Sequence, residues 1–144
     1  TVFSQMYFDP RYKPSIIQKR MVDANLLGRK TGKGFYDYNQ PALNPQPLKD
    51  ENTGEEIFFR ILSMLINEAA ETVYLKIASV EDIDLAMTRG VNYPKGLLRW
   101  ADEIGIEKVV NKLQSLFDEY NEERYRTSTL LKKMIREKKK FYNE

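Results

Sequence analysis

The sequence predicts an all-α fold, and three observations support this prediction. Apolar residues recur at helical spacing along most of the chain, and no segment alternates apolar and polar residues as a half-buried strand would. Serine and acidic residues stand where helices are expected to begin. Glycine and proline interrupt the pattern where helices are expected to end. We therefore expect a helical bundle.

In the first third of the chain, the residue pattern predicts one helix, one loop and one linker. A helix is expected to start at Pro14 and Ser15 and to end at Gly28, with an apolar stripe formed by Ile16, Ile17, Met21, Val22 and Leu26. Residues 28–38, GRKTGKGFYDY, hold too many glycines for a helix and end in aromatic residues that we expect to dock on a core. Residues 39–53 contain three prolines among polar residues and predict an extended linker.

The remainder predicts a series of helices separated by clear breaks. A long helix over residues 55–77 is expected to bury a broad face made of Ile57, Ile61, Leu62, Leu65, Ala69, Val73 and Leu75. Ser79, with Asp82 three residues later, predicts the cap of a helix that runs to Gly90. Further helices are expected after the glycine-containing turn at residues 92–96, over residues 106–120, and after Ser128.

The composition is that of an ordinary globular protein, and it argues against several kinds of active site. The 144 residues are 42% hydrophobic and 31% charged, which is enough for one hydrophobic core. Cysteine and histidine are both absent, so we expect no metal site and no self-contained hydrolase triad. A formal net charge of +2 gives no general attraction to nucleic acid or membrane.

Two features of the sequence bear on where the protein resides and how complete it is. No apolar run reaches the roughly 20 residues that span a bilayer, and no secretory signal pattern opens the chain, so we expect a soluble, cytoplasmic protein. The chain opens at Thr1 without a methionine. We therefore expect a fragment whose true N-terminus lies upstream.

An internal repeat relates the two ends of the chain. Residues 11–22, RYKPSIIQKRMV, match residues 124–135, RYRTSTLLKKMI, through identities and conservative pairs. An aromatic pair follows each segment, Phe35 with Tyr36 and Phe141 with Tyr142, although the second copy lacks the glycine-rich loop. We interpret the two segments as equivalent ends of two copies, the first of them truncated. Chance similarity between lysine-rich helices is the alternative.

The glycine-rich loop resembles the segment that closes the C-terminal domain of the 3-hydroxyacyl-CoA dehydrogenase family. The second half of the chain is similar to the same family in the order and spacing of a further set of residues. These are Arg60, Asn67-Glu68-Ala69, Glu81-Asp82-Ile83-Asp84, Ala86-Met87, Gly90, Tyr93-Pro94-Lys95-Gly96 and Trp100-Ala101-Asp102. The resemblance covers nearly the whole chain outside the linker.

The resemblance implies a division of labour between domains. Members have an N-terminal Rossmann domain that binds NAD and carries the catalytic histidine and glutamate, while the helical C-terminal domain dimerises and closes over the acyl-CoA. The chain is then expected to hold the tail of a first helical repeat (residues 1–38), a proline-rich linker (39–53) and a second helical repeat (54–144). The expected partners are the Rossmann domain of the same polypeptide, an acyl-CoA and a second copy in a homodimer, with no nucleic acid and no membrane.

One departure from the family pattern bears on catalysis. The family places an asparagine before the arginine of the first long helix, where it helps to position substrate, but Phe59 precedes Arg60 here. A phenyl ring cannot supply an amide donor and acceptor. We therefore expect no catalytic residue and no bound cofactor in this chain. The alternative is a stand-alone helical interaction module without enzymatic activity.

Two basic segments admit a functional and a structural interpretation. Lys30 and Lys33, in the glycine-rich loop, are candidates for contact with a CoA phosphate, although the glycine spacing is not that of a P-loop. The structural interpretation is that the glycines permit positive φ angles and shape the turn. The lysine-rich residues 132–140 invite a nucleic-acid role, but a solvated helix face ending in basic residues is the ordinary explanation.

Two polar clusters also admit both interpretations. Glu81, Asp82 and Asp84 form an acidic group that could hold a metal ion or act as an acid/base pair, but acidic residues in a first turn interact favourably with the helix dipole. We expect Asp84 to hold the following turn through hydrogen bonds. Asn67 and Glu68 lie within an apolar helix, and a structural hydrogen bond to a loop of the bundle is expected there in preference to catalysis.

Overall fold

The computed structural model describes residue 5 and residues 8–142, and the chain divides into two compact units. Unit 1 comprises Thr1–Asp50 and unit 2 comprises Glu51–Glu144. The division falls after Asp50, a few residues before the boundary expected at residues 53 and 54. The reason is that helix α3 begins at Glu51 and so includes the last residues of the expected linker.

Over residues 8–50, unit 1 contains one α-helix between two short 3-10 helices. They are η1 (Pro10–Tyr12), α2 (Ile16–Asp23) and η2 (Pro41–Leu43). Ser15 caps α2, since its Oγ accepts from the N–H of Gln18 at 3.2 Å while Gln18 Oε1 accepts from the N–H of Ser15 at 3.1 Å. The predicted start at Ser15 is confirmed. The helix ends before Gly28, because Asn25 already has a left-handed φ of 57°.

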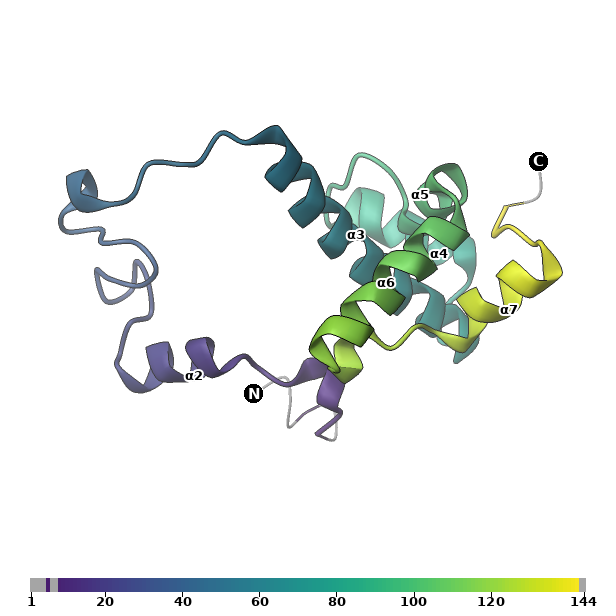
Figure 1. Ribbon diagram of the computed structural model, residues 1–144, viewed down its shortest axis with the longest axis horizontal. Coiled ribbons are helices and arrows are strands. Elements are labelled where there is room, and N and C mark those ends of the chain that lie inside the picture. Colours follow the sequence, from purple (N-terminus) through teal and green to yellow (C-terminus); the bar gives the residue numbers. More distant parts are fainter. Residues whose placement is uncertain (1–4, 6–7, 143–144) are drawn as a thin grey trace. The chain divides into compact units, whose positions relative to one another are not determined.

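Unit 2 is a bundle of helices joined by short connections (Figure 1). Its elements are α3 (Glu51–Tyr74), α4 (Val80–Leu85), the π-helix η3 (Ala86–Gly90), α5 (Leu97–Ile104), α6 (Ile106–Tyr120), the 3-10 helix η4 (Glu123–Tyr125) and α7 (Thr129–Glu137). The starts predicted after Ser79 and Ser128 are confirmed, and α6 has the predicted bounds.

The core of unit 2 lies where α3 packs against α5, α6 and α7. Ile66, Leu98, Leu113 and Leu131 are fully buried there. The buried face predicted for α3 is only half right, because Leu62 is buried but Ile57 and Ile61 are more than half exposed. The buried residues of α3 begin at Leu62, so its first turns lie outside the core.

The all-α prediction is confirmed for the described residues, which contain no strand. Two isolated bridges, Gly28 with Lys33 and Lys33 with Asp37, occur inside the glycine-rich loop. Over the same described range, no helix combines the length and the apolar character needed to cross a bilayer.

Candidate functional site

The glycine-rich loop of unit 1 is a tight turn held by its own backbone. The N–H of Gly28 donates to Lys33 O at 2.9 Å, and the N–H of Tyr38 donates to Gly32 O at 2.9 Å. Thr31 Oγ1 accepts from the N–H of Leu27 and donates to Lys33 O, both at 3.0 Å. These bonds define the loop independently of any bound molecule.

Two of its glycines are required by the backbone itself. Gly28 has a φ of +76°, a conformation that L side chains rarely adopt. At Gly34 a Cβ atom would lie 2.7 Å from the Cα of Gly28, so no side chain fits. The prediction that the glycines permit positive φ angles and shape the turn is therefore confirmed.

The two candidate lysines both lie in this loop and are exposed. Lys33 Nζ is 3.5 Å from Asp37 Oδ2, and 59% of the lysine side chain remains accessible. The pKa of Asp37 is lowered, chiefly by the N–H of Gln40 and also by Asn39 and Lys33. Within the described part of the chain Lys30 has no ion-pair partner, so its ammonium group is open to an anion.

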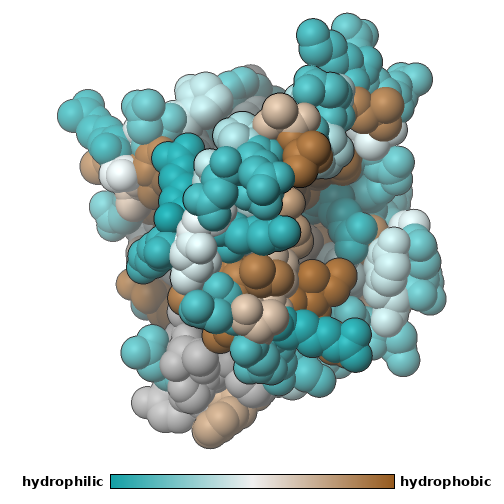
Figure 2. Space-filling view, turned by 90° about the vertical axis from the view of Figure 1, so that its left-hand side faces the viewer, coloured by the Kyte–Doolittle hydropathy of each residue, from teal (hydrophilic) through white to brown (hydrophobic). Residues whose placement is uncertain are grey.

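Beside these lysines, unit 1 has an open hollow of about 620 Å³ between α2 and the loop. Most of its lining is apolar or aromatic: Met21, Val22, Leu26, Leu27, Phe35, Tyr36 and Tyr38, with Gln18, Gly28, Lys30 and Gly34. Figure 2 shows the side of the molecule that is on the left in Figure 1, where apolar side chains reach the surface among polar ones. The prediction that the loop aromatics dock on a core is wrong for the described structure: Phe35 is 73% exposed, because unit 1 buries none of its described residues.

In unit 2, Asp84 is a buried carboxylate that organises the start of α5. It accepts from the N–H of Leu98 at 2.8 Å, the N–H of Arg99 at 2.9 Å and the hydroxyl of Tyr142 at 2.9 Å. The residue before α5 is Gly96, which has no side chain to cap the helix, so Asp84 supplies the missing acceptor from another helix. The predicted role of Asp84 is confirmed.

Asp102 provides a second carboxylate clamp, which the sequence did not reveal. Its two oxygens accept from the N–H groups of Phe141 and Tyr142 at 3.0 and 2.9 Å. Arg99 lies over the ring of Tyr142 at 4.1 Å, and burial followed by the bond to Asp84 raises the pKa of Tyr142 to about 12. Asp102 is one of the residues that resemble the family pattern. Its bonds to the N–H groups of Phe141 and Tyr142 join positions about forty residues apart, so no local pattern in the sequence indicated this role.

The other two acids of the predicted cluster are explained by helix initiation. Ser79 Oγ accepts from the N–H of Asp82 at 3.1 Å and donates to Asp82 Oδ2 at 2.8 Å. Glu81 lies in the same first turn of α4. Among the described residues, no group of three or more potential ligands is placed to hold a metal ion.

Asn67 connects α3 to the segment before α7. Its Oδ1 accepts from the N–H of Ser128 at 2.7 Å, and its Nδ2 donates to Arg126 O at 3.0 Å. Asn67 is only 3% exposed, so both polar ends of the amide are satisfied inside the bundle. The expected structural role is confirmed for Asn67.

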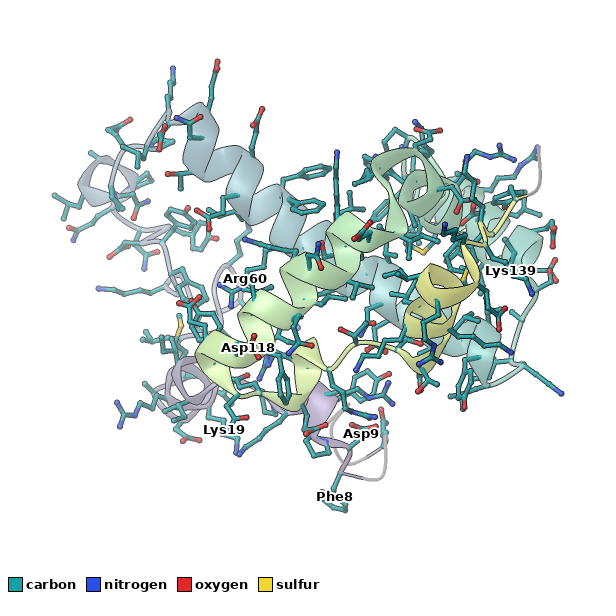
Figure 3. All side chains as sticks on the ribbon, turned by 45° about the vertical axis from the view of Figure 1, so that its right-hand side comes forward. Phe8, Asp9, Lys19, Arg60, Asp118 and Lys139 are labelled. Atoms are coloured by element: carbon teal, nitrogen blue, oxygen red, sulfur yellow. The ribbon has the colours of Figure 1, made fainter. Side chains whose placement is uncertain are left out.

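Arg60 projects from α3 toward the end of α6, as Figure 3 shows. Its guanidinium group lies 4.8 Å from the ring centre of Tyr120 and 5.2 Å from that of Tyr125, and it hydrogen-bonds the Tyr125 hydroxyl. That hydrogen bond is the main cause of the raised pKa of Arg60. The basic tail has ordinary neighbours, since Lys133 and Lys139 both pair with Glu137.

A family model for the 3-hydroxyacyl-CoA dehydrogenase C-terminal domain matches residues 1–38 and 57–142. The chain belongs to this family. The match covers the glycine-rich loop and the bundle that holds Asn67, Asp84 and Asp102, and it leaves residues 39–56 unmatched.

Two dehydrogenases, each named for a 3-hydroxyacyl-CoA, are similar to this chain or to part of it. A 3-hydroxyadipyl-CoA dehydrogenase from Escherichia coli K12 is 42% identical over 76 residues, which are 53% of this chain and 16% of that protein. A 3-hydroxybutyryl-CoA dehydrogenase from Clostridioides difficile is 28% identical over 135 residues, 94% of this chain and 47% of that protein. The chain thus spans less than half the length of these relatives.

Solved structures agree on the fold. The crystal structure of a 3-hydroxybutyryl-CoA dehydrogenase from Escherichia coli matches 92% of this chain and 46% of its own, with a TM-score of 0.71 and 23% identity. At that identity the match shows the fold alone. An (S)-3-hydroxybutyryl-CoA dehydrogenase from Ralstonia eutropha matches 55% of this chain and 28% of its own, with a TM-score of 0.54 and 35% identity.

The dinucleotide cofactor of this family does not fit the residues present here. A dinucleotide site needs a strand that leads through a glycine-rich turn into a helix, whose N-terminus then faces the pyrophosphate. The glycine-rich loop of this chain follows α2 and folds back through the isolated bridges to Lys33 and Asp37. No step of a redox reaction is therefore assigned to these residues.

Proposed function

We propose that the chain is the C-terminal part of an NAD-dependent 3-hydroxyacyl-CoA dehydrogenase that converts 3-hydroxyacyl-CoA to 3-oxoacyl-CoA. The family match on both sides of residues 39–56 carries this proposal. Residues 1–38 are the tail of a first helical repeat, 39–53 a linker, and 54–144 a second repeat. A Rossmann domain elsewhere in the polypeptide binds NAD and performs the chemistry, in the cytoplasm.

The polar interior of unit 2 supports a structural role for this unit in place of a catalytic one. The carboxylates of Asp84 and Asp102 accept from backbone N–H groups, and the amide of Asn67 spans two backbone groups. Side chains committed to such bonds are not available to move a substrate proton. Phe59, at the position where the family has an asparagine, offers no polar group either.

The test compares this chain with the longer polypeptide. We expect the longer polypeptide to reduce NAD in the presence of 3-hydroxybutyryl-CoA, and this chain to show no turnover. A longer polypeptide that folds but shows no turnover with any 3-hydroxyacyl-CoA would instead favour the stand-alone interaction module, the alternative that the phenyl ring of Phe59 also allows.

Lys30 and Lys33 are the proposed contacts of this chain with CoA. Both ammonium groups are exposed in one turn whose shape the backbone fixes, which suits binding of a phosphate without rearrangement. Each phosphate contact from an exposed lysine is worth about 1 kcal/mol or less, so we expect weak binding that salt abolishes.

Calorimetric titration can isolate this contact. The longer polypeptide should bind CoA more tightly than dephospho-CoA, and the Lys30→Ala, Lys33→Ala double variant should bind both equally. Lys19→Ala, an exposed lysine of α2, serves as the matched control. Retention of the preference for CoA by the double variant would remove these lysines from the site.

We propose homodimerisation through the first turns of α3. Ile57, Phe58 and Ile61 are each more than half exposed there, and Phe58 and Ile61 line an apolar hollow of about 300 Å³ with Tyr93 and Trp100. Apolar side chains gathered in this way favour association. Light scattering across a dilution series should show a dimer that Ile61→Glu dissociates without loss of helix content; a dimer unaffected by Ile61→Glu would place the interface elsewhere.

A further inference from the structure

A polar hollow lies in unit 2 between α5 and the segment that follows α7. Its volume is about 270 Å³, and its lining consists of Arg99, Asp102, Glu103, Lys140 and Tyr142. The first three belong to α5, and the other two belong to the end of the chain, which hydrogen bonds hold beside α5 (Figure 1). Each of these residues is charged or carries a hydroxyl, so this hollow differs in chemistry from the apolar hollow beside Phe58.

The two carboxylates of the hollow are already engaged. The two oxygens of Asp102 accept from the backbone N–H groups of residues 141 and 142, at 3.0 and 2.9 Å. Glu103 forms an ion pair with Lys95. Both carboxylates are therefore bonded within the protein.

The two cations of the hollow have no such partners. In the part of the chain that the structure describes, no side-chain N–H of Arg99 has an acceptor, and the ammonium group of Lys140 has neither an ion pair nor a hydrogen bond. A guanidinium group carries five N–H donors and an ammonium group carries three. The hollow thus combines engaged acceptors with free donors, which is the pattern expected of an anion site.

Tyr142 holds the guanidinium group of Arg99 in place. The guanidinium carbon lies over the ring of Tyr142, 4.1 Å from its centre. The ring is itself fixed, because its hydroxyl donates to Asp84 at 2.9 Å and its backbone N–H donates to Asp102 at 2.9 Å. The rigid fork of five N–H groups leaves several directed away from the ring, and two of them can meet two oxygens of one ligand.

The charges around the hollow are positive on balance. The lining has two cations and two acids, and Lys95 neutralises one of these acids. Residues 136–139, which lead to the hollow, add three cations and one acid. The other acids of this region are Asp84, which already accepts three hydrogen bonds, and Glu81, whose charge reaches the hydroxyl of Tyr142. Neither of these two lines the hollow.

A phosphate group matches this arrangement better than a carboxylate does. The fork of Arg99 can take two oxygens and the ammonium group of Lys140 a third, and a phosphate group presents three oxygens where a carboxylate presents two. A hollow of about 270 Å³ with two cations accommodates one phosphate group, not a row of them. This favours a small molecule over nucleic acid, which needs an extended basic surface.

We propose that the hollow between α5 and the segment after α7 binds the phosphate group of a small molecule. The guanidinium group of Arg99 and the ammonium group of Lys140 are the direct contacts, and Tyr142 is the residue that positions Arg99. The site lies within unit 2 and does not involve Lys30 or Lys33. It is therefore independent of the proposed dehydrogenase activity, and each proposal can fail without the other.

Nuclear magnetic resonance of the present chain tests the site directly. Sodium phosphate is titrated at an ionic strength that sodium chloride keeps constant, and the backbone amides of residues 99–103 and 140–142 are followed. We expect saturable shifts in these two segments, with a dissociation constant on the order of 1 mM for two charge-assisted contacts at a partly exposed site. Shifts that do not saturate, or that occur equally around all exposed lysines, would overturn the proposal.

Two substitutions test the direct contacts. Arg99→Lys keeps the charge but loses the fork, and Lys140→Met removes one cation, so each should weaken phosphate binding about tenfold. Arg89→Lys in η3 and Lys132→Met in α7, both at exposed positions, are the matched controls and should leave the affinity unchanged. An affinity that neither Arg99→Lys nor Lys140→Met changes, with helix content retained, would overturn the proposal.

Two substitutions of Tyr142 test its positioning role. Tyr142→Phe keeps the ring beneath Arg99 and loses only the bond to Asp84, so the affinity for phosphate should stay close to that of the parent chain. Tyr142→Leu removes the ring without changing any charge, and the affinity should fall about fivefold. Equal affinities of the two variants would overturn the role assigned to Tyr142.

A comparison of ligands identifies the source of the phosphate group. If glycerol 3-phosphate binds about tenfold more tightly than inorganic phosphate, the ligand is a phosphate ester; if the two bind equally, it is free phosphate. Either result supports a phosphate site. Acetate that binds as tightly as phosphate would overturn the choice of phosphate over carboxylate.

Discussion

The hydroxyl of Tyr142 donates a hydrogen bond to Oδ2 of Asp84, with 2.9 Å between the two oxygens. The bond joins the residues after α7 to the end of α4, 58 positions earlier in the chain. Asp84 also holds the first N–H groups of α5, so the last described residue of unit 2 acts on the carboxylate that initiates a core helix. The C-terminal segment is thus part of the bundle, not an appendage.

Replacement of Tyr142 by phenylalanine should destabilise unit 2 by about 1 kcal/mol, the usual net worth of one such hydrogen bond. The ring and its contact with Arg99 remain, so the loss is confined to the hydroxyl. Urea unfolding followed by circular dichroism measures the change. Tyr74→Phe, in which a half-exposed tyrosine of α3 loses its hydroxyl, is the control and should change stability little.

The same tyrosine predicts a loss of stability in alkali. The pKa of Tyr142 is raised to about 12 in the folded chain, against 10.0 for a free tyrosine. Because the folded chain favours the protonated hydroxyl, the contribution of Tyr142 to the free energy of unfolding is complete below pH 10. This contribution is lost as the pH rises from 10 to 12. The free energy of unfolding of the parent chain should exceed that of Tyr142→Phe at pH 8. After allowance for solvent screening, we expect this excess to be about 1 kcal/mol smaller at pH 11.5. A difference that is constant with pH would contradict the shift.

Asn67→Ala should lower the free energy of unfolding more than Tyr142→Phe does. Removal of the amide leaves the N–H of Ser128 and the carbonyl of Arg126 without their partner beside a buried segment, and each group then bears its full desolvation cost. We expect a loss of about 2–4 kcal/mol in the free energy of unfolding. Asn111→Ala, at an exposed position of α6, is the matched control. A loss no larger than that of the control would mean that water replaces the amide.

The helices could be predicted from sequence because their signals are local. Ser15, Ser79 and Ser128 each bond to an N–H within the next three residues, so the residues that define the starts of α2, α4 and α7 are adjacent in sequence. The expectation that Asp84 holds the following turn is confirmed, but its bonds to the N–H groups of Leu98 and Arg99 reach 14 and 15 residues along the chain, so the sequence could not show which groups it would hold.

The parts that could not be predicted depend on contacts distant in sequence. Asp102 binds the backbone at Phe141 and Tyr142, and Arg60 meets Tyr125 across 65 positions. Apolar periodicity marks a face of α3 as hydrophobic but cannot say where along the helix the neighbouring helices end. For that reason Ile57 and Ile61 were expected in the core and lie at the surface.

Gly96 and Asp84 should behave as a coupled pair. A Cβ atom at position 96 would overlap the Asp84 carboxylate, although the φ of −66° suits any residue. Gly96→Ala alone should cost about 2 kcal/mol or more through overpacking and loss of the cap. In an Asp84→Ala background the clash is gone, so the same change should cost much less. Gly90→Ala, where nothing lies within 4 Å of the added Cβ, is the control. Additive effects of the two substitutions would rule out the overlap.

Replacement of Arg60 by lysine should destabilise unit 2 although the positive charge is retained. Its planar guanidinium lies over Tyr120 while it hydrogen-bonds the hydroxyl of Tyr125, and a lysine ammonium cannot face a ring and a hydroxyl in that geometry. We expect Arg60→Lys to lower the free energy of unfolding by about 1 kcal/mol and Arg60→Met by slightly more. In the Tyr120→Leu background the cost of Arg60→Lys should fall, because the ring that distinguishes the two cations is absent. Arg89→Lys, on the exposed surface of η3, provides the comparison for an arginine without such neighbours. If Arg60→Lys and Arg89→Lys unfold at the same urea concentration, charge alone accounts for Arg60 and its contact with the ring of Tyr120 contributes nothing.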